Sequence, residues 1–220
     1  MLKKLDIGKT FMKTKMQSAS KSQKQIWDAI ANEWYEFKTA PSETATDLIN
    51  NSKGKILDFG SGAGRNLLNL KKSEQRELYL IDFSEKMIRL AKQRAKKLGL
   101  NIKTKVSEIE KTPFKDDFFD AVICVSVIHC IKTSKKREQA IKELYRILKP
   151  GAKADIEVWN KNSPRFKNAP KEKLISWRDK GKRYYYFFEE EELKNLLEKT
   201  GFKILKQIPH KANIVFIAKK

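Results

Sequence analysis

Cysteine, histidine and long apolar runs are scarce in this chain of 220 residues. Its two cysteines, Cys124 and Cys130, lie in one apolar segment at a spacing that suits neither a zinc site nor a disulfide framework, which indicates a reduced compartment. The longest apolar stretch, residues 118–131, is too short to span a bilayer. The start, MLKKLDIGKT, lacks the apolar core of a signal peptide. We therefore expect a cytoplasmic protein with no membrane anchor and no metal site.

Acidic residues are too few to balance the basic ones. Lysine and arginine total 48 against 27 acids, which gives a formal net charge of +21. A surface adapted to heat can carry many lysines without binding anything, but glutamate then rises with lysine, and here it does not. The excess therefore favours a polyanionic partner such as a nucleic acid. Residues 1–25 hold seven lysines and one acid with little apolar periodicity, which predicts a flexible basic arm before one domain at residues 26–220.

Strands and helices are predicted to alternate along this domain. Apolar spacing predicts a helix from Ile26 to Phe37 and a short helix at residues 42–50. Only Pro209, His210 and Lys211 separate the last two strands, so these must be antiparallel. The fold class is therefore α/β, a Rossmann-like, seven-stranded and mostly parallel sheet with the last strand antiparallel and helices on both faces. The predicted strands are residues 55–59, 77–82, 101–106, 120–127, 152–159, 202–208 and 212–218, and the later helices are residues 64–72, 84–99, 135–151 and 189–201.

A glycine-rich turn follows the first of these strands, in the stretch KILDFGSGAGRN. Ligands of open parallel sheets bind beyond the carboxyl ends of the strands, and Gly60, Gly62 and Gly64 suit such a turn. A dinucleotide fingerprint would need its third glycine at position 65, which is Arg65, and no Gly-Lys-Ser/Thr follows for a phosphate loop. An ordinary tight connection is the alternative interpretation.

Two acids indicate which ligand this turn accepts. Asp58 at the strand end would repel a phosphate but suits a cationic ligand, and S-adenosylmethionine carries an ammonium and a sulfonium group. Asp82 ends the next strand 24 residues later, close to the separation expected for an acid that binds ribose hydroxyls. We therefore predict that two carboxylates at adjacent strand ends bracket S-adenosylmethionine.

With this pattern, residues 26–220 resemble the class I S-adenosylmethionine-dependent methyltransferases. The resemblance implies a seven-stranded sheet with a reversed last strand. It also implies that the glycine turn after the first strand holds the methionine end of the cofactor. Asp82 and Phe83 would hold the ribose, and Glu108 and Ile109 would contact the adenine. Glu108 stands where such enzymes often have aspartate. The implied cofactor-binding residues are Trp34, Asp58, Gly60, Ser61, Gly62, Gly64, Asp82, Phe83, Glu108, Ile109 and Val125.

Three further stretches narrow the resemblance. The sequences IANEWYEFKTAP, EIEKTPFKDDFFDAVICVSVIHC and SWRDKGKRYYYFFEEEEL resemble the tRNA methyltransferases that esterify 5-carboxymethyluridine at the wobble position of the anticodon. The resemblance implies tRNA as the substrate, and a small zinc-containing activator protein as a frequent partner of this family. The predicted edge strand at residues 101–106 is polar and carries two lysines, a composition that keeps an edge unpaired, so we expect a monomer that is active alone.

Such an acceptor needs no general base. A carboxymethyl group has a pKa of about 4 and is already ionised at neutral pH. The protein must instead align oxygen, methyl carbon and sulfur, and cationic or donor side chains should hold the carboxylate. The candidates for this catalytic role are His129, Lys38 and Arg183. The family has arginine at position 38 and tends to have a second histidine at position 130, and His129 could instead be a strand-end residue bonded to backbone.

A basic and aromatic insertion at residues 160–186 is the predicted RNA surface. Residues 161–183 contain nine lysines or arginines and two acids, interleaved with aromatic residues that could stack on unpaired bases. In the alternative interpretation, Trp177 and at least one tyrosine pack inward. The predicted RNA-binding residues are Arg65, Arg165, Lys167, Trp177, Arg178, Lys182, Tyr184 and Tyr185.

Two other functions remain open from the sequence. A methyltransferase of a small carboxylic or phenolic metabolite would have a closed apolar pocket and no salt-sensitive RNA binding. A noncatalytic RNA-binding subunit could keep the same fold, although Asp58, the three glycines and Asp82 argue for a working cofactor site.

Overall fold

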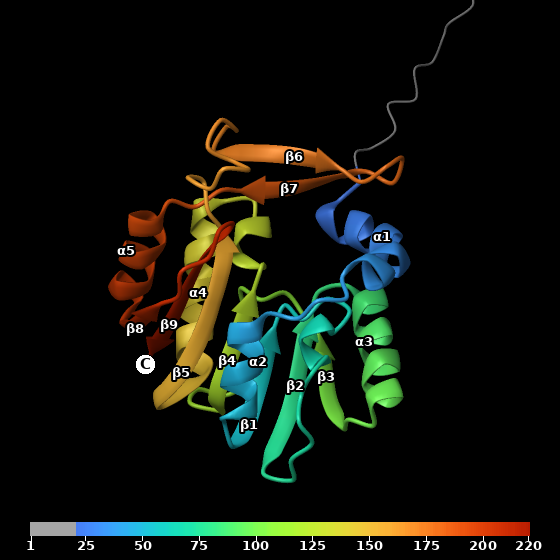
Figure 1. Cartoon of the computed structure of the whole chain (residues 1–220), viewed down its shortest axis with the longest axis vertical. Helices are drawn as coiled ribbons and strands as arrows, with labels where there is room; N and C mark the ends of the chain where they lie inside the picture. The colour runs from blue at the N-terminus through green and yellow to red at the C-terminus, as the bar shows by residue number, and fades with distance from the viewer. Residues whose placement is uncertain (1–20) are drawn as a thin grey trace, which may run out of the picture.

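A computed structural model describes residues 21–220, and most of the predicted basic arm lies outside these residues. The described residues form three layers, with helices on both faces of a seven-stranded sheet (Figure 1). The strands of this sheet are β1 (Gly54–Phe59), β2 (Arg76–Asp82), β3 (Ile102–Val106), β4 (Phe119–Val125), β5 (Leu148–Trp159), β8 (Lys203–Gln207) and β9 (Asn213–Lys219). The helices are α1 (Gln23–Phe37), α2 (Glu43–Asn50), α3 (Glu85–Leu98), α4 (Ser134–Ile147) and α5 (Glu190–Thr200).

The strand order confirms the predicted fold class. It is β3-β2-β1-β4-β5-β9-β8. Neighbouring strands from β3 to β5 are parallel, whereas β9 is antiparallel to both β5 and β8. Because the order reverses between β1 and β4, the connections that leave these strands run in opposite directions and open a crevice at their carboxyl ends.

The central strands are buried on both faces. Leu57 and Phe59 of β1 pack in the core covered by α4 and α5, whereas Ile56 packs in the core covered by α2 and α3. A strand alternates its side chains between two faces, so both sets of positions must be apolar when both faces are covered. This arrangement fixes the register of β1 and so places the residues that follow it at the crevice.

The helix ends follow local sequence signals. Ser84 caps α3 because its hydroxyl accepts a hydrogen bond from the backbone N–H of Met87 at 3.1 Å. Gly99 ends the same helix at a φ of 63°. At the other end of the domain, α1 begins at Gln23 with Ser22 as its cap, so residues 23–25, which the prediction placed in the arm, form the first turn of this helix.

Two predicted helices differ from the structure. Residues 64–72 were predicted as a helix, but only one 3₁₀ turn forms, at Arg65–Leu67, before Asn69 turns away with a φ of 64°. The helix predicted to residue 151 ends at Ile147, and β5 begins at the next residue. A register shift between β4 and β5 accommodates this early strand start.

The insertion at residues 160–186 contains a hairpin that the sequence analysis missed. Strands β6 (Glu172–Ser176) and β7 (Lys182–Tyr186) form a separate two-stranded antiparallel sheet. This hairpin lies above the carboxyl ends of the central strands and reaches α1 (Figure 1). The Gln23 side chain joins the two elements, since its amide donates to the Lys182 carbonyl at 3.1 Å and accepts from the Tyr184 N–H at 2.9 Å. We call α1 and the β6–β7 hairpin the roof.

Between residues 21 and 220, each helix is either too short or too polar to cross a lipid bilayer.

Candidate cofactor and acceptor site

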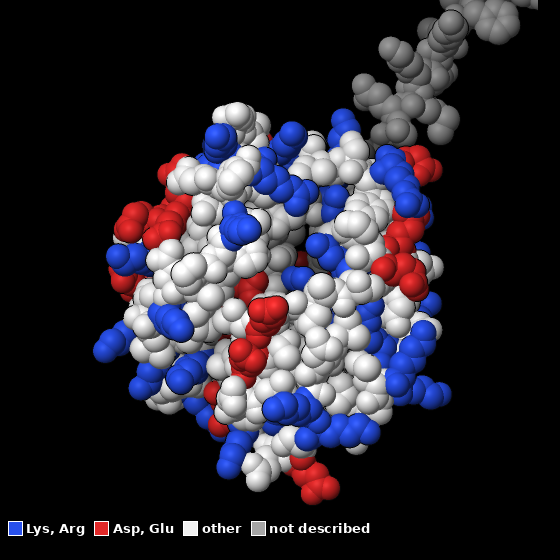
Figure 2. Space-filling view, in the orientation of Figure 1, with Lys and Arg blue, Asp and Glu red and all other residues white. Residues whose placement is uncertain are grey.

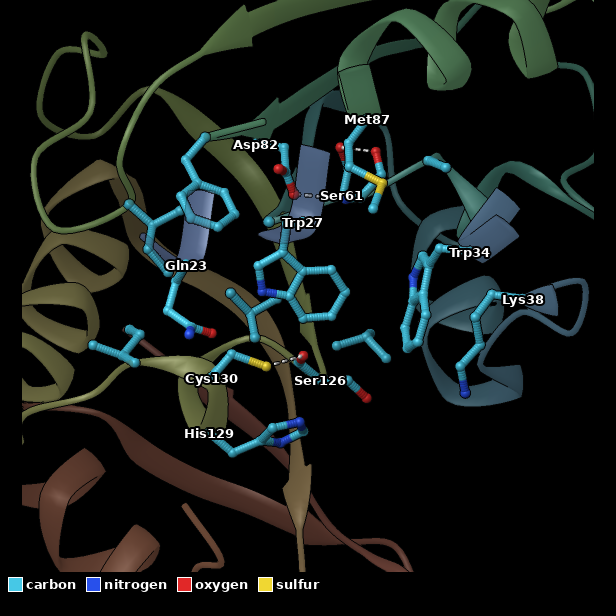
Figure 3. Close-up of a pocket in the computed structure, with 18 of the residues that line it drawn as sticks. Gln23, Trp27, Trp34, Lys38, Ser61, Asp82, Met87, Ser126, His129 and Cys130 are labelled. Carbon is cyan, nitrogen blue, oxygen red and sulfur yellow. Dashed lines mark hydrogen bonds between the residues drawn. The ribbon is translucent and has the colours of Figure 1, made fainter. Parts of the chain in front are cut away.

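A cavity of about 260 Å³ lies between the roof and the carboxyl ends of β1, β2 and β4. Figure 2 shows the hollow below the hairpin, with lysine and arginine side chains near its mouth. In Figure 3, Asp82 and Ser61 lie on one side of the cavity and His129 on the other, with Trp27 between them in this view. The site therefore has an acidic end at the glycine turn and a second end at His129.

The glycine turn supplies bare backbone at the acidic end. The N–H groups of Gly60 and Ser61 both donate to the Ile81 carbonyl, at 2.9 and 2.8 Å, which ties the end of β1 to β2. Gly60 has a φ of 82°, and a Cβ there would lie 2.5 Å from Val127. Gly62 has a φ of 52°, but no atom lies within 4 Å of its Cβ position. The turn is thus packed tightly at Gly60 and open to a ligand at Gly62.

Asp82 is held by this turn and lines the cavity. Its Oδ2 accepts from the N–H of Gly62 and its Oδ1 from the N–H of Ser84, each at 2.9 Å. Burial raises the pKa of Asp82 to about 6, although these two N–H groups oppose the rise. Each carboxylate oxygen keeps a second lone pair, so a diol could still donate to this side chain.

Asp58 lies behind the glycine turn and is not among the residues that line the cavity. It accepts a hydrogen bond from the Asn66 amide at 3.3 Å, and Asn66 itself lines the cavity. Burial raises the pKa of Asp58 to about 7, against the opposing effects of Asn66 and Arg65. Of the two carboxylates predicted to bracket a ligand, only Asp82 reaches the cavity, and Asp58 can act on a ligand through its charge.

His129 is buried at the opposite end and is neutral. Its Nδ1 accepts from the backbone N–H of Trp159 at 3.0 Å, so the proton of the neutral ring is on Nε2. Burial first, and then the charges of Arg65 and Lys38, lower the pKa of His129 to about 3. The prediction of a strand-end histidine bonded to backbone and the prediction of a donor in the site are therefore compatible, with His129 as an uncharged donor.

Positive charges gather at the same end of the cavity. Lys38 and Arg65 both line it. Burial lowers the pKa of Lys38, and the charges of Arg65, Arg165 and Arg183 lower it further. Burial also lowers the pKa of Arg65, whose guanidinium donates to the Ala40 carbonyl at 3.2 Å. The carboxylates of Glu157 and Asp58 oppose the lowering of the Arg65 pKa, whereas an anion bound beside Lys38 would relieve the repulsion that the arginines exert on it.

Arg183 is not among the residues that line the cavity. It lies against a group of aromatic rings that we call the aromatic wall: Trp27, Trp34, Trp177 and Tyr185. Its guanidinium carbon lies 5.5, 5.1, 4.8 and 5.2 Å from the ring centroids of Trp27, Trp34, Trp177 and Tyr185. It also donates to the Tyr185 hydroxyl at 2.6 Å. In this arrangement Arg183 positions the aromatic wall, rather than holding a carboxylate directly as predicted.

The predicted RNA-binding residues separate into three groups. Tyr184 and Tyr185 are buried, so their rings cannot stack on a base at the outer surface, although Tyr185 lines the cavity. Trp177 is half-buried and donates to Glu33 at 2.6 Å, while Arg65 lines the cavity. Arg178 is exposed but forms an ion pair with Glu33 at 3.1 Å. The four exposed residues on the insertion are Arg165, Lys167, Arg178 and Lys182.

Most of the predicted cofactor residues line one cavity, and some lining residues were missed. Two of the predicted cofactor residues, Asp58 and Gly64, do not line the cavity. The missed residues include Trp27, which lies two turns before Trp34 on α1, and Trp159, the last residue of β5. The position of Trp159 at a strand end could have indicated its role. The predicted cofactor residues on the wall are Trp34, Gly60, Ser61, Gly62, Asp82, Phe83, Glu108, Ile109 and Val125.

Comparisons with known proteins agree with this geometry. Residues 56–151 match a family described as a methyltransferase domain. A mouse protein named "Probable tRNA methyltransferase 9B" is 30% identical over 122 residues, which are 56% of this chain and 25% of that protein. A ubiquinone/menaquinone biosynthesis C-methyltransferase of Geotalea daltonii is 33% identical over 117 residues, 51% of this chain and 48% of that protein. The chain thus covers half or less of each of these two relatives.

Solved structures extend the similarity to nearly the whole domain. An S-adenosylmethionine-dependent methyltransferase of Methanosarcina mazei has a TM-score of 0.67 and 25% identity, over 82% of this chain and 98% of that one. A Haloferax volcanii protein solved with the Trm112 methyltransferase activator has the same TM-score at 15% identity, over 91% and 99% of the two chains. The fold is that of the class I S-adenosylmethionine-dependent methyltransferases, and the cavity lies at the strand ends where ligands of such sheets bind. Within that class, the chain resembles the tRNA methyltransferase 9B proteins over about half of its length.

The residues at the cavity fit S-adenosylmethionine. The open space at Gly62 leaves room for a ligand against bare backbone, and Asp82 offers acceptors for ribose hydroxyls. Phe83 and Ile109 form an apolar part of the cavity wall beside Glu108. Partial burial and the charge of Glu110 raise the pKa of Glu108.

Cofactor affinity is expected to increase about tenfold as the pH rises from 5.5 to 8, because a shift of one pKa unit on binding corresponds to a tenfold change. The folded protein raises the pKa of Asp58 to about 7 and of Asp82 to about 6, so both are largely protonated at pH 5.5 and ionised at pH 8. Only the ionised forms attract a sulfonium. Isothermal titration calorimetry across this range measures the effect, and Asp58→Asn should remove the part near pH 7. An affinity independent of pH would contradict this assignment.

Proposed function

We propose that this protein transfers a methyl group from S-adenosylmethionine to the carboxylate of 5-carboxymethyluridine at the wobble position of tRNA. The observation that carries the proposal is the group of positive charges around a neutral histidine donor. Lys38 and Arg65 line the same end of the cavity as His129, and their charges lower its pKa. Such a site favours an anionic acceptor that also accepts a hydrogen bond.

The proposed reaction requires the acceptor carboxylate to be positioned, but it requires no proton transfer. The acceptor carboxylate has a pKa of about 4 and is ionised at neutral pH. The cofactor supplies a methyl group on a positively charged sulfur, and no proton needs to move. The Nε2–H of His129 can then orient one carboxylate oxygen, while Lys38 and Arg65 offset the charge of the acceptor.

The outer surface supports an RNA substrate. The net charge is +21, and four basic residues are exposed on the insertion: Arg165, Lys167, Arg178 and Lys182. Basic side chains of this kind contact phosphates, and the affinity they provide decreases steeply as salt rises. The name of the mouse relative supports the same substrate class.

Methyl transfer to bulk tRNA that lacks this modification tests the proposal. Nucleoside mass spectrometry after the reaction should find one added methyl group on carboxymethyluridine. Transfer to a ring carbon or to a ribose would contradict the proposed acceptor while leaving the methyltransferase class intact.

The similarity to a ubiquinone/menaquinone C-methyltransferase favours a second candidate function, methylation of a small carboxylic or phenolic metabolite. Trp27, Trp159 and Tyr185 supply an aromatic lining that such a substrate could use. Filter binding of tRNA at increasing salt separates the two candidates, because only the tRNA substrate requires salt-sensitive binding. A noncatalytic RNA-binding subunit would fail to bind S-adenosylmethionine in calorimetry.

We further propose that the protein acts in the cytoplasm as a monomer that is competent without an activator. The outer edge of β3 carries exposed lysines at positions 103 and 105, which disfavour the addition of a strand. The Haloferax volcanii complex supports the opposite arrangement for a protein of the same fold. Activity of the purified chain without any partner would support the monomer.

A further inference from the structure

Phe37 is an aromatic side chain that is 63% exposed at the end of α1. Its ring lies 5.4 Å from that of Trp177, edge to face, and 6.0 Å from that of Trp34. Lys38 places its Nζ 5.5 Å from the Phe37 ring and 5.4 Å from the Trp34 ring. The exposed ring is therefore held in place by Trp177 and by two residues that also line the cavity, Trp34 and Lys38.

The rings of the roof form a continuous series from the cavity to the surface. Trp27 and Trp34 line the cavity and lie 5.1 Å apart. Trp34 contacts Trp177 at 5.3 Å, and Trp177 contacts Phe37. We call these four residues the aromatic track. A flat ligand group in the cavity would thus be followed by a second ring position outside it.

The charges beside the outer end of the aromatic track select the kind of ligand. Lys38 lies over two of its rings, and Arg178 and Lys182 are exposed on the hairpin that carries Trp177, where Arg178 also forms an ion pair with Glu33 at 3.1 Å. Flat apolar rings interleaved with cations are typical of surfaces that bind single-stranded nucleic acid, where bases stack and phosphates pair with basic side chains. A protein partner would need no such alternation of rings and cations.

We propose that Phe37 stacks on the unpaired nucleobase next to the nucleotide that enters the cavity, so that the aromatic track binds two consecutive nucleotides of one strand. The inference rests on the proposed function for its RNA substrate. It adds a subsite for a neighbouring base, which is independent of the group that is methylated.

Binding of an unmodified anticodon stem-loop RNA, followed by fluorescence anisotropy without cofactor, tests this subsite. Phe37→Ala is expected to weaken binding about tenfold, since stacking of one base on an aromatic ring contributes at this level. Phe37→Leu should weaken it similarly because it keeps an apolar side chain but lacks a π face, whereas Phe37→Trp should bind as well as the original protein. Leu205→Ala is the matched control, because Leu205 is 43% exposed on β8 at the far edge of the sheet. Thermal unfolding checks that each variant is folded.

Unchanged RNA affinity in Phe37→Ala would overturn the proposal and leave the exposed ring for a protein partner. An equal loss of affinity for a fully base-paired RNA would also overturn it, because stacking requires an unpaired base. The test needs neither methyl donor nor carboxymethyl group. Failure of the proposed methylation would therefore leave a Phe37-dependent preference for unpaired RNA intact, and successful methylation with normal Phe37→Ala binding would refute the subsite alone.

Discussion

Replacing Asp82 by alanine is expected to lower the affinity for S-adenosylmethionine by about 100-fold or more. Hydrogen bonds to a charged group contribute about 1.5–3 kcal/mol each, and two ribose hydroxyls can donate to this carboxylate. Asp82 also accepts from the N–H groups of Gly62 and Ser84, so its loss leaves the glycine turn without support. Isothermal titration calorimetry measures the effect directly.

Two further variants separate these contributions. Asp82→Asn replaces one acceptor by an amide that faces an N–H group, so it should bind the cofactor almost as poorly as alanine does. Glu85→Gln removes a nearby charge on a side chain that is 70% exposed and should leave the affinity within about twofold, because exposed charges are screened. An Asp82→Ala protein with normal affinity would place the ribose elsewhere.

Gly60→Ala is expected to lower the free energy of unfolding by about 2–5 kcal/mol. A left-handed backbone costs an alanine about 1–2 kcal/mol, and overpacking adds about 1–3 kcal/mol. The overpacking arises because the new Cβ would lie 2.5 Å from Val127. Thermal unfolding should show a decrease in Tm of about 4–20 °C for a chain of this size.

Gly62→Ala is the matched comparison, because this glycine also has a positive φ but has no atom within 4 Å of its Cβ position. Its unfolding free energy should fall by about 1–2 kcal/mol, from backbone conformation alone. The added methyl group would occupy space at the cavity wall, so cofactor affinity should fall by about tenfold. Equal destabilisation of the two variants would contradict the steric difference between the two ends of the turn.

The part of the site that could be predicted from sequence is the part that local signals encode. Gly60 and Gly62 directly follow a predicted strand, and Asp82 ends the next strand, 24 residues after Asp58. The structure places Gly60, Gly62 and Asp82 at one cavity wall. The mostly parallel sheet and its antiparallel last strand followed from the alternation of strands and helices and from one short final connection. Such features depend on turn residues and on the connections between consecutive strands and helices, which can be read from short stretches of sequence.

The predictions that were wrong depend on contacts between distant segments. The tyrosines at positions 184 and 185 look like exposed stacking residues beside so many lysines, but the hairpin turns them inward. Arg183 was predicted to hold a carboxylate. In the structure its guanidinium lies against the rings of Trp27 and Trp34, which come from a helix some 150 residues earlier in the chain. The 3₁₀ turn at Arg65–Leu67 replaces a predicted helix where Asn66 bonds to Asp58 and Arg65 to the Ala40 carbonyl, contacts that helical periodicity does not encode.

The double hydrogen bond of Gln23 to β7 links residues separated by about 160 positions in the chain. Contacts of such high sequence separation form late, because a long loop must close before they contribute. On a ribosome, the glycine turn and Asp82 would emerge well before the hairpin that completes the roof. A growing chain could therefore hold a half-built, open cleft, and the enclosed cavity would exist only once nearly all of the protein has been synthesised.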